Sequence, residues 1–515
     1  MSVPLPMSSN ALNAKIHDGA PPPGNLTVID QSKSLPMYYR RLALIFLLTL
    51  PLVNPWVRGD GVGYYAYIRS LLVEHKLDFT HDWQAGNESF TMGRVHADGT
   101  IDQLQYTVTG RIANHWTVGP ALLWAPVLVP VHCTMLTLQK VGMKVKANGF
   151  SRPYIIAMAL TTALYGFLGL LISFRLACFY TEERWAFLAT LGIWFASALP
   201  VYMYFNPSWS HAHSVFVVAV FLWYWHRTRK GRTFSQWAIL GLISGLVLDI
   251  HYANIAVLLV PLLESLQAYW RAFRAPPEPD WRRLLRIFWA NLLYSFATLV
   301  AFLPTLITRK MIYGNPLDFG YSEAGEFRWD APHFVGALFS SDHGLLVWTP
   351  ILILALAGLM LVFNRNRTMA VYFITVFVTL CYLIGGDPTW DGLSSFGNRY
   401  FLCLTPLFII GFAVFLSKIP KWLNGTRHPM ACARSVTALF ILWNLAFIFQ
   451  WGTHMVPARG PISWKQMVRN QFTEVPRRAT SELTAYFENR NALMQHIEQE
   501  DIKQWQQQQG APKSN

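Results

Sequence analysis

The chain has little charge and few cysteines. Only 14% of its 515 residues are charged and 53% are hydrophobic, whereas soluble proteins carry roughly 25% charged residues. It therefore lacks the polar surface of a soluble fold, and the composition predicts a polytopic membrane protein. The five cysteines are scattered and show no CxxC or metal-ligand spacing; they are Cys133, Cys178, Cys381, Cys403 and Cys432.

Acidic residues are also scarce, with 28 Asp and Glu against 42 Lys and Arg, which gives a net charge of +14. Such a charge can indicate nucleic-acid binding, but here the basic residues gather in short segments between apolar runs, as membrane topology signals do. We therefore predict no nucleic-acid partner. Residues 1–36 are polar and lack the design of a cleaved signal peptide, so we predict a disordered cytosolic arm.

Long apolar runs dominate the rest of the chain. Crossing a membrane takes about 20 mostly apolar residues, and eleven runs qualify: 41–57, 153–176, 185–204, 211–227, 235–252, 254–270, 285–307, 344–363, 368–385, 401–417 and 433–453. A twelfth run, 118–137, is interrupted by three prolines. If it dips into the membrane without crossing, the N-terminal arm and most basic loops share one side, as the positive-inside rule expects. We therefore predict about eleven transmembrane helices.

This topology leaves short basic loops in the cytoplasm and long segments outside. The outer segments are the first loop, 58–152, with interfacial helices, a later loop, 308–343, and a C-terminal tail, 456–515. Residues 37–455 form the predicted transmembrane catalytic domain. No internal repeat relates two halves, which argues against transporters built from duplicated bundles. We expect an integral multi-pass protein of a bacterial inner membrane, among membrane lipids, with its chemistry on the extracytoplasmic face.

One carboxylate stands where the chain leaves the first apolar run. Asp60 lies in Arg58-Gly59-Asp60-Gly61, and an acid at the mouth of a membrane helix is costly enough to be a functional-site hypothesis by default. Residues 62–74 follow with apolar side chains at helical spacing, which predicts an amphipathic helix in the membrane interface. The plain alternative is that Asp60 only caps this helix.

This arrangement resembles the GT-C membrane glycosyltransferases, which include protein O-mannosyltransferases, lipid A aminoarabinose transferases and the catalytic subunits of oligosaccharyltransferase. The string Gly59-Asp60-Gly61, with Tyr64 and Tyr65 after it, is similar to the catalytic-loop motif of that family. The resemblance implies an all-α GT-C-type bundle and a donor sugar linked to polyprenyl phosphate. It also implies Asp60 as the catalytic residue, with Tyr64 and Tyr65 in substrate binding.

A second segment, 385–401, resembles the place where these enzymes position an arginine opposite the lipid phosphate of the donor. Here that residue is Arg399, preceded by Gly397-Asn398. A guanidinium at the outer membrane surface suits bidentate binding of phosphate oxygens, although a snorkelling anchor is the plain alternative. The loop 308–343, with Arg309 and Lys310 and a helix start at residues 344–350, is similar to loops of the bacterial O-mannosyltransferase-like branch.

The chain departs from this family after the third span. Many relatives carry a second acid there, whereas this chain has His211 and His213. In an extended turn the two could approach one phosphate, acceptor or metal, but no third ligand follows, so a divalent metal is doubtful and we predict no cofactor. Asp249 and His251, at the outer end of the fifth span, are candidates for substrate binding or plain interface caps.

The predicted reaction moves one sugar to a hydroxyl or amine of a glycan, lipid or protein acceptor. Asp60 would act as general base, and direct attack would invert the anomeric carbon. Arg399, helped by Arg309 or Lys310, would stabilise the departing phosphate. Because a phosphate needs no protonation, one carboxylate suffices, unlike the paired acids of glycoside hydrolysis.

Two alternatives remain open on the sequence. A polymerase or ligase of lipid-linked glycans would share the donor chemistry. A transporter or flippase would place charged groups within its spans and show alternating-access symmetry, whereas the charged residues of this chain concentrate at the ends of the apolar runs.

Overall fold

The computed structural model describes residues 35–320, 327–422 and 428–510. Within these residues every regular element is helical, apart from two isolated β-bridges. The predicted all-helical class is therefore confirmed. The predicted cytosolic arm, 1–36, lies outside the described residues except for its last two.

The helices are bounded as follows: α1 Leu35–Thr49, η1 Leu50–Leu52, α2 Asp60–Val73, α3 Thr80–Gln84, α4 Glu88–Thr91, η2 Gln103–Gln105, α5 Gly119–Lys140, α6 Arg152–Ala177, α7 Glu183–Phe195, η3 Val201–Phe205, α8 His211–Thr228, α9 Phe234–Ile250, η4 Tyr252–Leu258, α10 Leu259–Phe273, α11 Trp281–Tyr313, α12 Phe334–Phe339, α13 Leu345–Trp348, α14 Ile351–Leu361, η6 Val362–Asn364, α15 Arg367–Gly386, η7 Arg399–Leu404, α16 Thr405–Leu416, α17 Ile419–Trp422, α18 Pro429–Gly452, α19 Trp464–Phe472, α20 Glu474–Glu488 and α21 Arg490–Gly510.

The chain is an integral membrane protein. Among the described residues, eight helices are long and apolar enough to cross a membrane, and two shorter apolar helices, Phe234–Ile250 and Ile351–Asn364, accompany them. The eight are Leu35–Leu52, Gly119–Lys140, Arg152–Ala177, Tyr252–Phe273, Trp281–Tyr313, Arg367–Gly386, Arg399–Trp422 and Pro429–Gly452. The number of eleven crossings stays a prediction.

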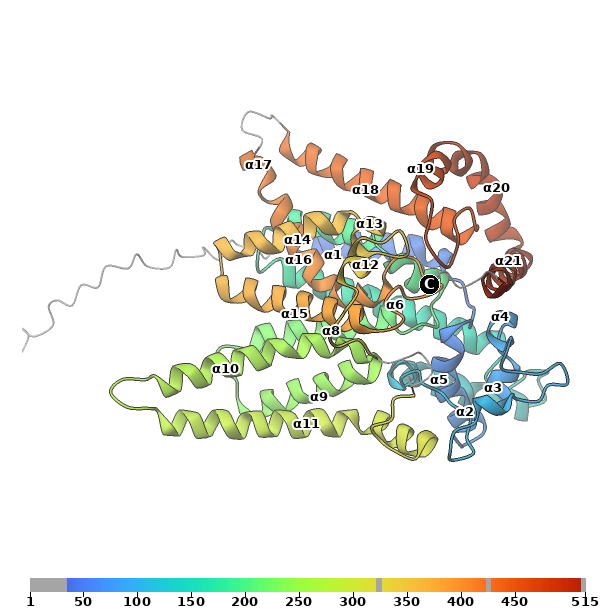
Figure 1. Cartoon of the computed structure of the whole chain (residues 1–515), viewed down its shortest axis with the longest axis horizontal. Coiled ribbons are helices and arrows are strands. Elements are labelled where there is room, and N and C mark those ends of the chain that lie inside the picture. Colours follow the sequence, from blue (N-terminus) through green and yellow to red (C-terminus); the bar gives the residue numbers. More distant parts are fainter. Residues whose placement is uncertain (1–34, 321–326, 423–427, 511–515) are drawn as a thin grey trace, which may run out of the picture.

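The long helices form a bundle with the loop helices gathered at one end. Figure 1 shows α2–α5 and α19–α21 at this end, and the turn between α10 and α11 at the opposite end. Glycines let some helices approach closely: Gly245 of α9 lies against the backbone of α11, and Gly358 of α14 lies against Gly411 of α16. Small residues serve this purpose in membrane bundles, where apolar side chains gain little from leaving lipid.

The helix α5 starts and ends at the same end of the bundle. Gly119, its first residue, packs on the backbone of Asp249 at the end of α9. Near its other end, His132 Nδ1 lies 2.7 Å from Tyr154 Oη at the start of α6. Because α5 is also long and apolar enough to cross a membrane, whether residues 118–137 cross stays a prediction. The helix continues through Pro126 and Pro130, which membrane helices tolerate when neighbours cover the freed carbonyls.

The later outer loop begins further along the chain than predicted. The helix α11 runs for 33 residues, about 50 Å at 1.5 Å per residue, so residues 308–313 are helical. It ends at Gly314, whose φ of +78° forms a left-handed C-cap. Arg309 and Lys310 therefore lie on a helix and not in a loop.

The helix α2 is enclosed by protein, which the amphipathic pattern does not predict. Residues 61–70 are all buried, because the rest of the first outer loop and α5 wrap around it. Asn114 Nδ2, for example, donates to the carbonyl of Gly63 at 2.9 Å. The N-cap is Gly59, not Asp60, so the carboxylate of Asp60 is available for another partner.

Candidate active site

Asp60 and Arg399 form an ion pair, with Arg399 Nη2 2.8 Å from Asp60 Oδ2. The backbone around Asp60 requires glycine on both sides. Gly59 has a φ of +52°, a conformation that side chains with a Cβ rarely adopt. Gly61 lies so close to Ser208 that an added Cβ would overlap its hydroxyl. The two glycines thus fix the carboxylate at the first residue of α2.

Arg399 is held by aromatic rings but keeps donor capacity. Its guanidinium lies 4.3 Å from the ring centroid of Trp209 and 5.3 Å from that of Tyr400. Trp209 in turn donates from Nε1 to the carbonyl of Arg58 at 3.0 Å. Among the described residues, no hydrogen-bond partner is found for the buried Nε of Arg399. The guanidinium can therefore bind an anion without losing its aromatic supports.

The ion pair lines a cavity of about 1010 Å³ with two chemically different sides. The polar side is formed by Arg58, Asp60, Arg94, His115, Arg399 and Arg459. The apolar side comes from α18, α20 and α21, and includes Leu442, Leu445, Ala446, Phe449, Val475, Ala479, Leu483, Leu493, Met494 and Ile497. Leu442 is 68% exposed, so this wall is continuous with the outer surface of α18. The cavity suits a molecule with an anionic head and an apolar tail.

The C-terminal helices close this cavity, a role that the sequence did not indicate. Arg58 forms an ion pair with Asp501 of α21, and lies 3.6 Å from Glu498. Glu498 also accepts hydrogen bonds from Asn87 Nδ2 at 2.7 Å and from the backbone N–H of Ser89 at 2.6 Å. The C-terminal tail therefore contacts the first outer loop, and Figure 1 shows α21 beside α4.

The two predicted histidines of α8 point to different places. His211 lies beside the ion pair, with ring centroids 5.7 Å from His251 and 6.3 Å from Tyr400. His213 instead packs between α5 and α6, 5.2 Å from the ring of Trp124. Residues two positions apart on a helix do not share a face. Both residues lie in α8, so the extended turn in which the pair could share one ligand does not form.

The two predicted tyrosines of α2 also separate. Tyr64 faces the site, where its hydroxyl accepts a hydrogen bond from Ser210 at 3.0 Å. Tyr65 lies on the other side of α2 and donates to the carbonyl of Gly149 at 2.7 Å. Its position gives Tyr65 a structural contact between the two ends of the first outer loop.

Three further candidates lie away from the cavity. Arg309 is fully buried and donates to the carbonyls of Asn114, at 2.6 Å, and Trp116, which ties α11 to the first outer loop. Lys310 is exposed and donates to the carbonyl of Gly314 at 2.7 Å. Asp249 accepts a hydrogen bond from Thr305 at 2.5 Å. None of the three is among the residues that line the cavity.

Several residues of the polar side escaped the sequence prediction. His115 lies close enough to Asp60 for its charge to matter, yet burial lowers the pKa of His115 to about 4. Arg94 and Arg459 add positive charge from the first outer loop and from the segment after α18. No motif marks these residues, because they approach Asp60 only through the folding of separate loops.

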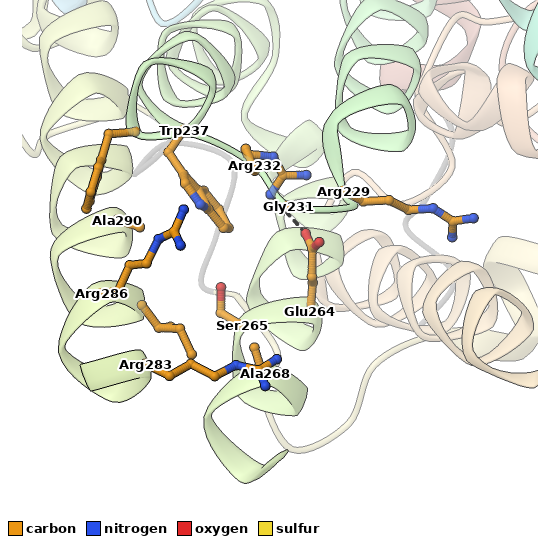
Figure 2. A pocket seen from close by; sticks show the side chains of 12 residues that line it. Arg229, Gly231, Arg232, Trp237, Glu264, Ser265, Ala268, Arg283, Arg286 and Ala290 are labelled. Carbon is orange, nitrogen blue, oxygen red and sulfur yellow. Dashed lines mark hydrogen bonds and ion pairs between the residues drawn. The ribbon is translucent and has the colours of Figure 1, made fainter. Parts of the chain in front are cut away.

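A smaller cavity of about 280 Å³ lies at the opposite end of the bundle (Figure 2). Arg232 is buried there, 3.0 Å from Glu264 and with its guanidinium 4.3 Å from the ring centroid of Trp237. Arg283 and Arg286 reach this cavity from the start of α11. The two cavities share no lining residue, so this cavity is separate from the candidate active site.

Comparisons with known proteins give likenesses to solved structures alone. No protein-family model and no curated protein matches the chain. Among solved structures, the fold is similar to the crystal structure of ArnT from Cupriavidus metallidurans in the apo state, with a TM-score of 0.43 and 14% sequence identity. The likeness covers 90% of this chain and 77% of that chain. Likeness at this level says nothing about what the chain binds or catalyses.

Proposed function

We propose that the protein is a membrane glycosyltransferase of the GT-C type, which moves a sugar from a polyprenyl-phosphate donor to a hydroxyl or amine of an acceptor on the extracytoplasmic face. The observation that carries this proposal is the Asp60–Arg399 ion pair in a cavity with a basic side and an apolar wall. A carboxylate supplies a general base, a guanidinium supplies a phosphate contact, and the wall supplies a surface for a lipid chain.

The donor would lie with its prenyl chain along α18 and its phosphate on Arg399. Leu442 and Leu445 of α18 are exposed and line the cavity, so a lipid can reach them from the membrane. Arg399 lines this cavity, and its buried Nε has no hydrogen-bond partner among the described residues. Charged N–H groups stabilise a phosphate whose negative charge grows as the sugar leaves. Arg94 and Arg459, which also line the cavity, add to this positive potential.

Asp60 would take the proton of the acceptor while its oxygen or nitrogen attacks the anomeric carbon. The bond between that carbon and the phosphate oxygen breaks as the new bond forms, so the configuration inverts. The proton goes to Asp60 and the electron pair stays on the lipid phosphate. Donor binding must first draw Arg399 from Asp60, because the guanidinium, with Nη2 2.8 Å from Asp60 Oδ2, occupies a carboxylate oxygen that would take the proton.

The proposal is tested with Asp60→Asn in purified protein supplied with polyprenyl-phosphate sugars and candidate acceptors. Loss of a general base lowers turnover by about 10²- to 10⁴-fold, so sugar transfer should fall by this amount while donor binding persists. Arg399→Gln should instead weaken donor binding as well as turnover. Asp98→Asn is the matched control, since Asp98 lies in the same outer loop and bonds only to Thr100 among the described residues.

Full transfer activity of Asp60→Asn at normal expression would refute the catalytic assignment. Unchanged donor affinity in Arg399→Gln would refute the phosphate contact. If the wild-type protein exchanges lipid-linked sugars between leaflets and transfers none, the transporter alternative is correct instead.

A further inference from the structure

Asp342, His343 and Asp391 form a compact cluster outside the Asp60–Arg399 site. One ligand atom from each of these residues lies within 4.8 Å of the others. Asp342 and His343 precede α13, and Asp391 lies in the loop between α15 and η7. The cluster therefore joins two outer loops that are distant in the sequence. Acidic clusters are common without a ligand, so the state of the histidine decides how this one is interpreted.

His343 is fully buried, and its ring has no good hydrogen bond. Within the described residues, neither ring nitrogen has a partner of hydrogen-bond geometry. Its Nδ1 lies 3.3 Å from Asp342 Oδ1, and the carbonyls of Asp391 and Ala458 also face the ring. Leaving a buried polar group unsatisfied costs about 1–3 kcal/mol. Such a group, with a carboxylate oxygen of Asp342 and one of Asp391 within 4.8 Å of its ring nitrogen, indicates that something else completes the cluster.

The backbone supports the same conclusion. His343 has a φ of +57°, which is uncommon for a residue with a side chain and costs of order 1–3 kcal/mol. Strained residues of this kind occur mainly where the surrounding structure uses the side chain in a fixed direction. With this backbone, the imidazole of His343 is buried, with Nδ1 3.3 Å from Asp342 Oδ1.

We infer that Asp342, His343 and Asp391 bind one divalent transition-metal ion, of the Zn²⁺ or Mn²⁺ type. A cation would satisfy the imidazole and offset the repulsion between two neighbouring carboxylates. Imidazole is a poor ligand for Mg²⁺ and Ca²⁺ but a good one for transition metals. Three protein ligands leave at least one position for water. Arg399 and Arg459 are close enough to oppose a cation electrostatically, so the affinity should be moderate.

The metal would act as a positioning element for Arg399. Gly392 follows Asp391, and a Cβ added there would lie 3.8 Å from Cγ of Arg399. Asn398, directly before Arg399, donates to the carbonyl of Trp390 at 2.8 Å. Holding Asp391 on Asp342 and His343 would therefore fix the loop that carries Arg399. The inference does not depend on the proposed sugar transfer, because metal binding is measured without any substrate.

The test measures metal content in the full chain, purified with a histidine-free tag, stripped with EDTA and dialysed. Zn²⁺, Mn²⁺ and Mg²⁺ are then titrated separately, followed by elemental analysis and thermal unfolding. We expect about one equivalent of Zn²⁺ or Mn²⁺ per chain, a higher unfolding temperature with either, and no effect of Mg²⁺ at equal concentration.

Two variants should lose this binding. His343→Asn removes the imidazole while keeping a residue that tolerates a left-handed backbone, and Asp391→Asn removes one carboxylate at nearly constant shape. His333→Asn and Asp330→Asn are the controls, since both residues are exposed in the same outer loop. Absence of stoichiometric uptake by the wild-type chain would overturn the inference. So would equal uptake by either cluster variant that folds, because the metal would then sit elsewhere.

Discussion

The ion pair between Asp60 and Arg399 predicts a specific pattern of stability losses. The Arg399 side chain is 6% exposed, whereas the Asp60 side chain is 28% exposed. Asp60→Asn would leave a buried guanidinium without its carboxylate, which costs about 3–5 kcal/mol in buried pairs. Arg399→Gln would leave a carboxylate that water can reach, so its electrostatic cost should be smaller, roughly 1 kcal/mol. The loss of the cation–π contact with Trp209 adds about 1–2 kcal/mol.

The double variant Asp60→Asn/Arg399→Gln contains neither isolated charge. We expect it to be less destabilised than the sum of the single variants, by about 1–3 kcal/mol of coupling energy. The measurement is the free energy of unfolding of all four proteins in one mixed-micelle system, with denaturant as the variable. Correct folding of each variant is checked by size-exclusion chromatography before unfolding.

Additive losses in this cycle would show that the two side chains do not interact in solution, and the role given to the pair would fail. A double variant less stable than the sum would also contradict the reasoning, because two neutral amides leave no buried unpaired charge. If the two side chains couple, and the coupling energy disappears when a lipid phosphate is added, the result would support a change of partner in which Arg399 leaves Asp60 and binds the donor phosphate.

Three further predictions concern residues around the site. Arg309→Met should destabilise the protein by about 3 kcal/mol or more, because it leaves buried carbonyls unsatisfied. Lys310→Met, at the next position, should change stability by less than about 0.5 kcal/mol. Thermal unfolding distinguishes the two variants, and equal losses of stability would contradict the contacts made by Arg309. The lowered pKa of His115 means that its stabilising contribution is present above about pH 6.5 and is lost as the pH falls toward 4. His115→Asn should therefore reduce the change in the free energy of unfolding over this pH range by on the order of 1 kcal/mol, which is seen as a flatter pH dependence of the unfolding temperature. An unchanged pH dependence would refute this role. The double variant Asp501→Asn/Glu498→Gln should loosen α21 from the first outer loop, which is seen as faster proteolysis after α18 and weaker donor binding. Unaltered cleavage would show that these contacts do not hold α21 over the cavity.

Much of the fold could be predicted from the sequence because each membrane helix is determined by the hydrophobicity of its own stretch of residues. Each needs about 20 apolar residues in one stretch, so the apolar runs identify nearly all the long helices without knowledge of their neighbours. The sequence also indicates Asp60 and Arg399 as candidate site residues, because each lies in a short, recognisable segment next to an apolar run. The amphipathic pattern of residues 62–74 misled, because it predicts an interface and cannot report that α5 and the first outer loop cover the remaining faces.

The roles of individual site residues depended on tertiary contacts. Arg309 and Arg399 are the same residue type at helix ends, but one is bound to loop carbonyls and the other faces Asp60 with unused donor capacity. Tyr64 and Tyr65 are adjacent, yet helix geometry sends them to opposite sides.

The sequence by itself determined that the chain is a helical membrane protein, and which two charged residues to examine first. Only the tertiary structure decided that these two residues meet, that the C-terminal helices close a cavity over them, and that Asp342, His343 and Asp391 converge beside Arg399. The physical reason is the separation along the sequence of the residues that interact. Hydrophobicity and helix formation depend on neighbours within a few turns, whereas an ion pair across more than 300 positions exists only once the bundle brings α2 and η7 together.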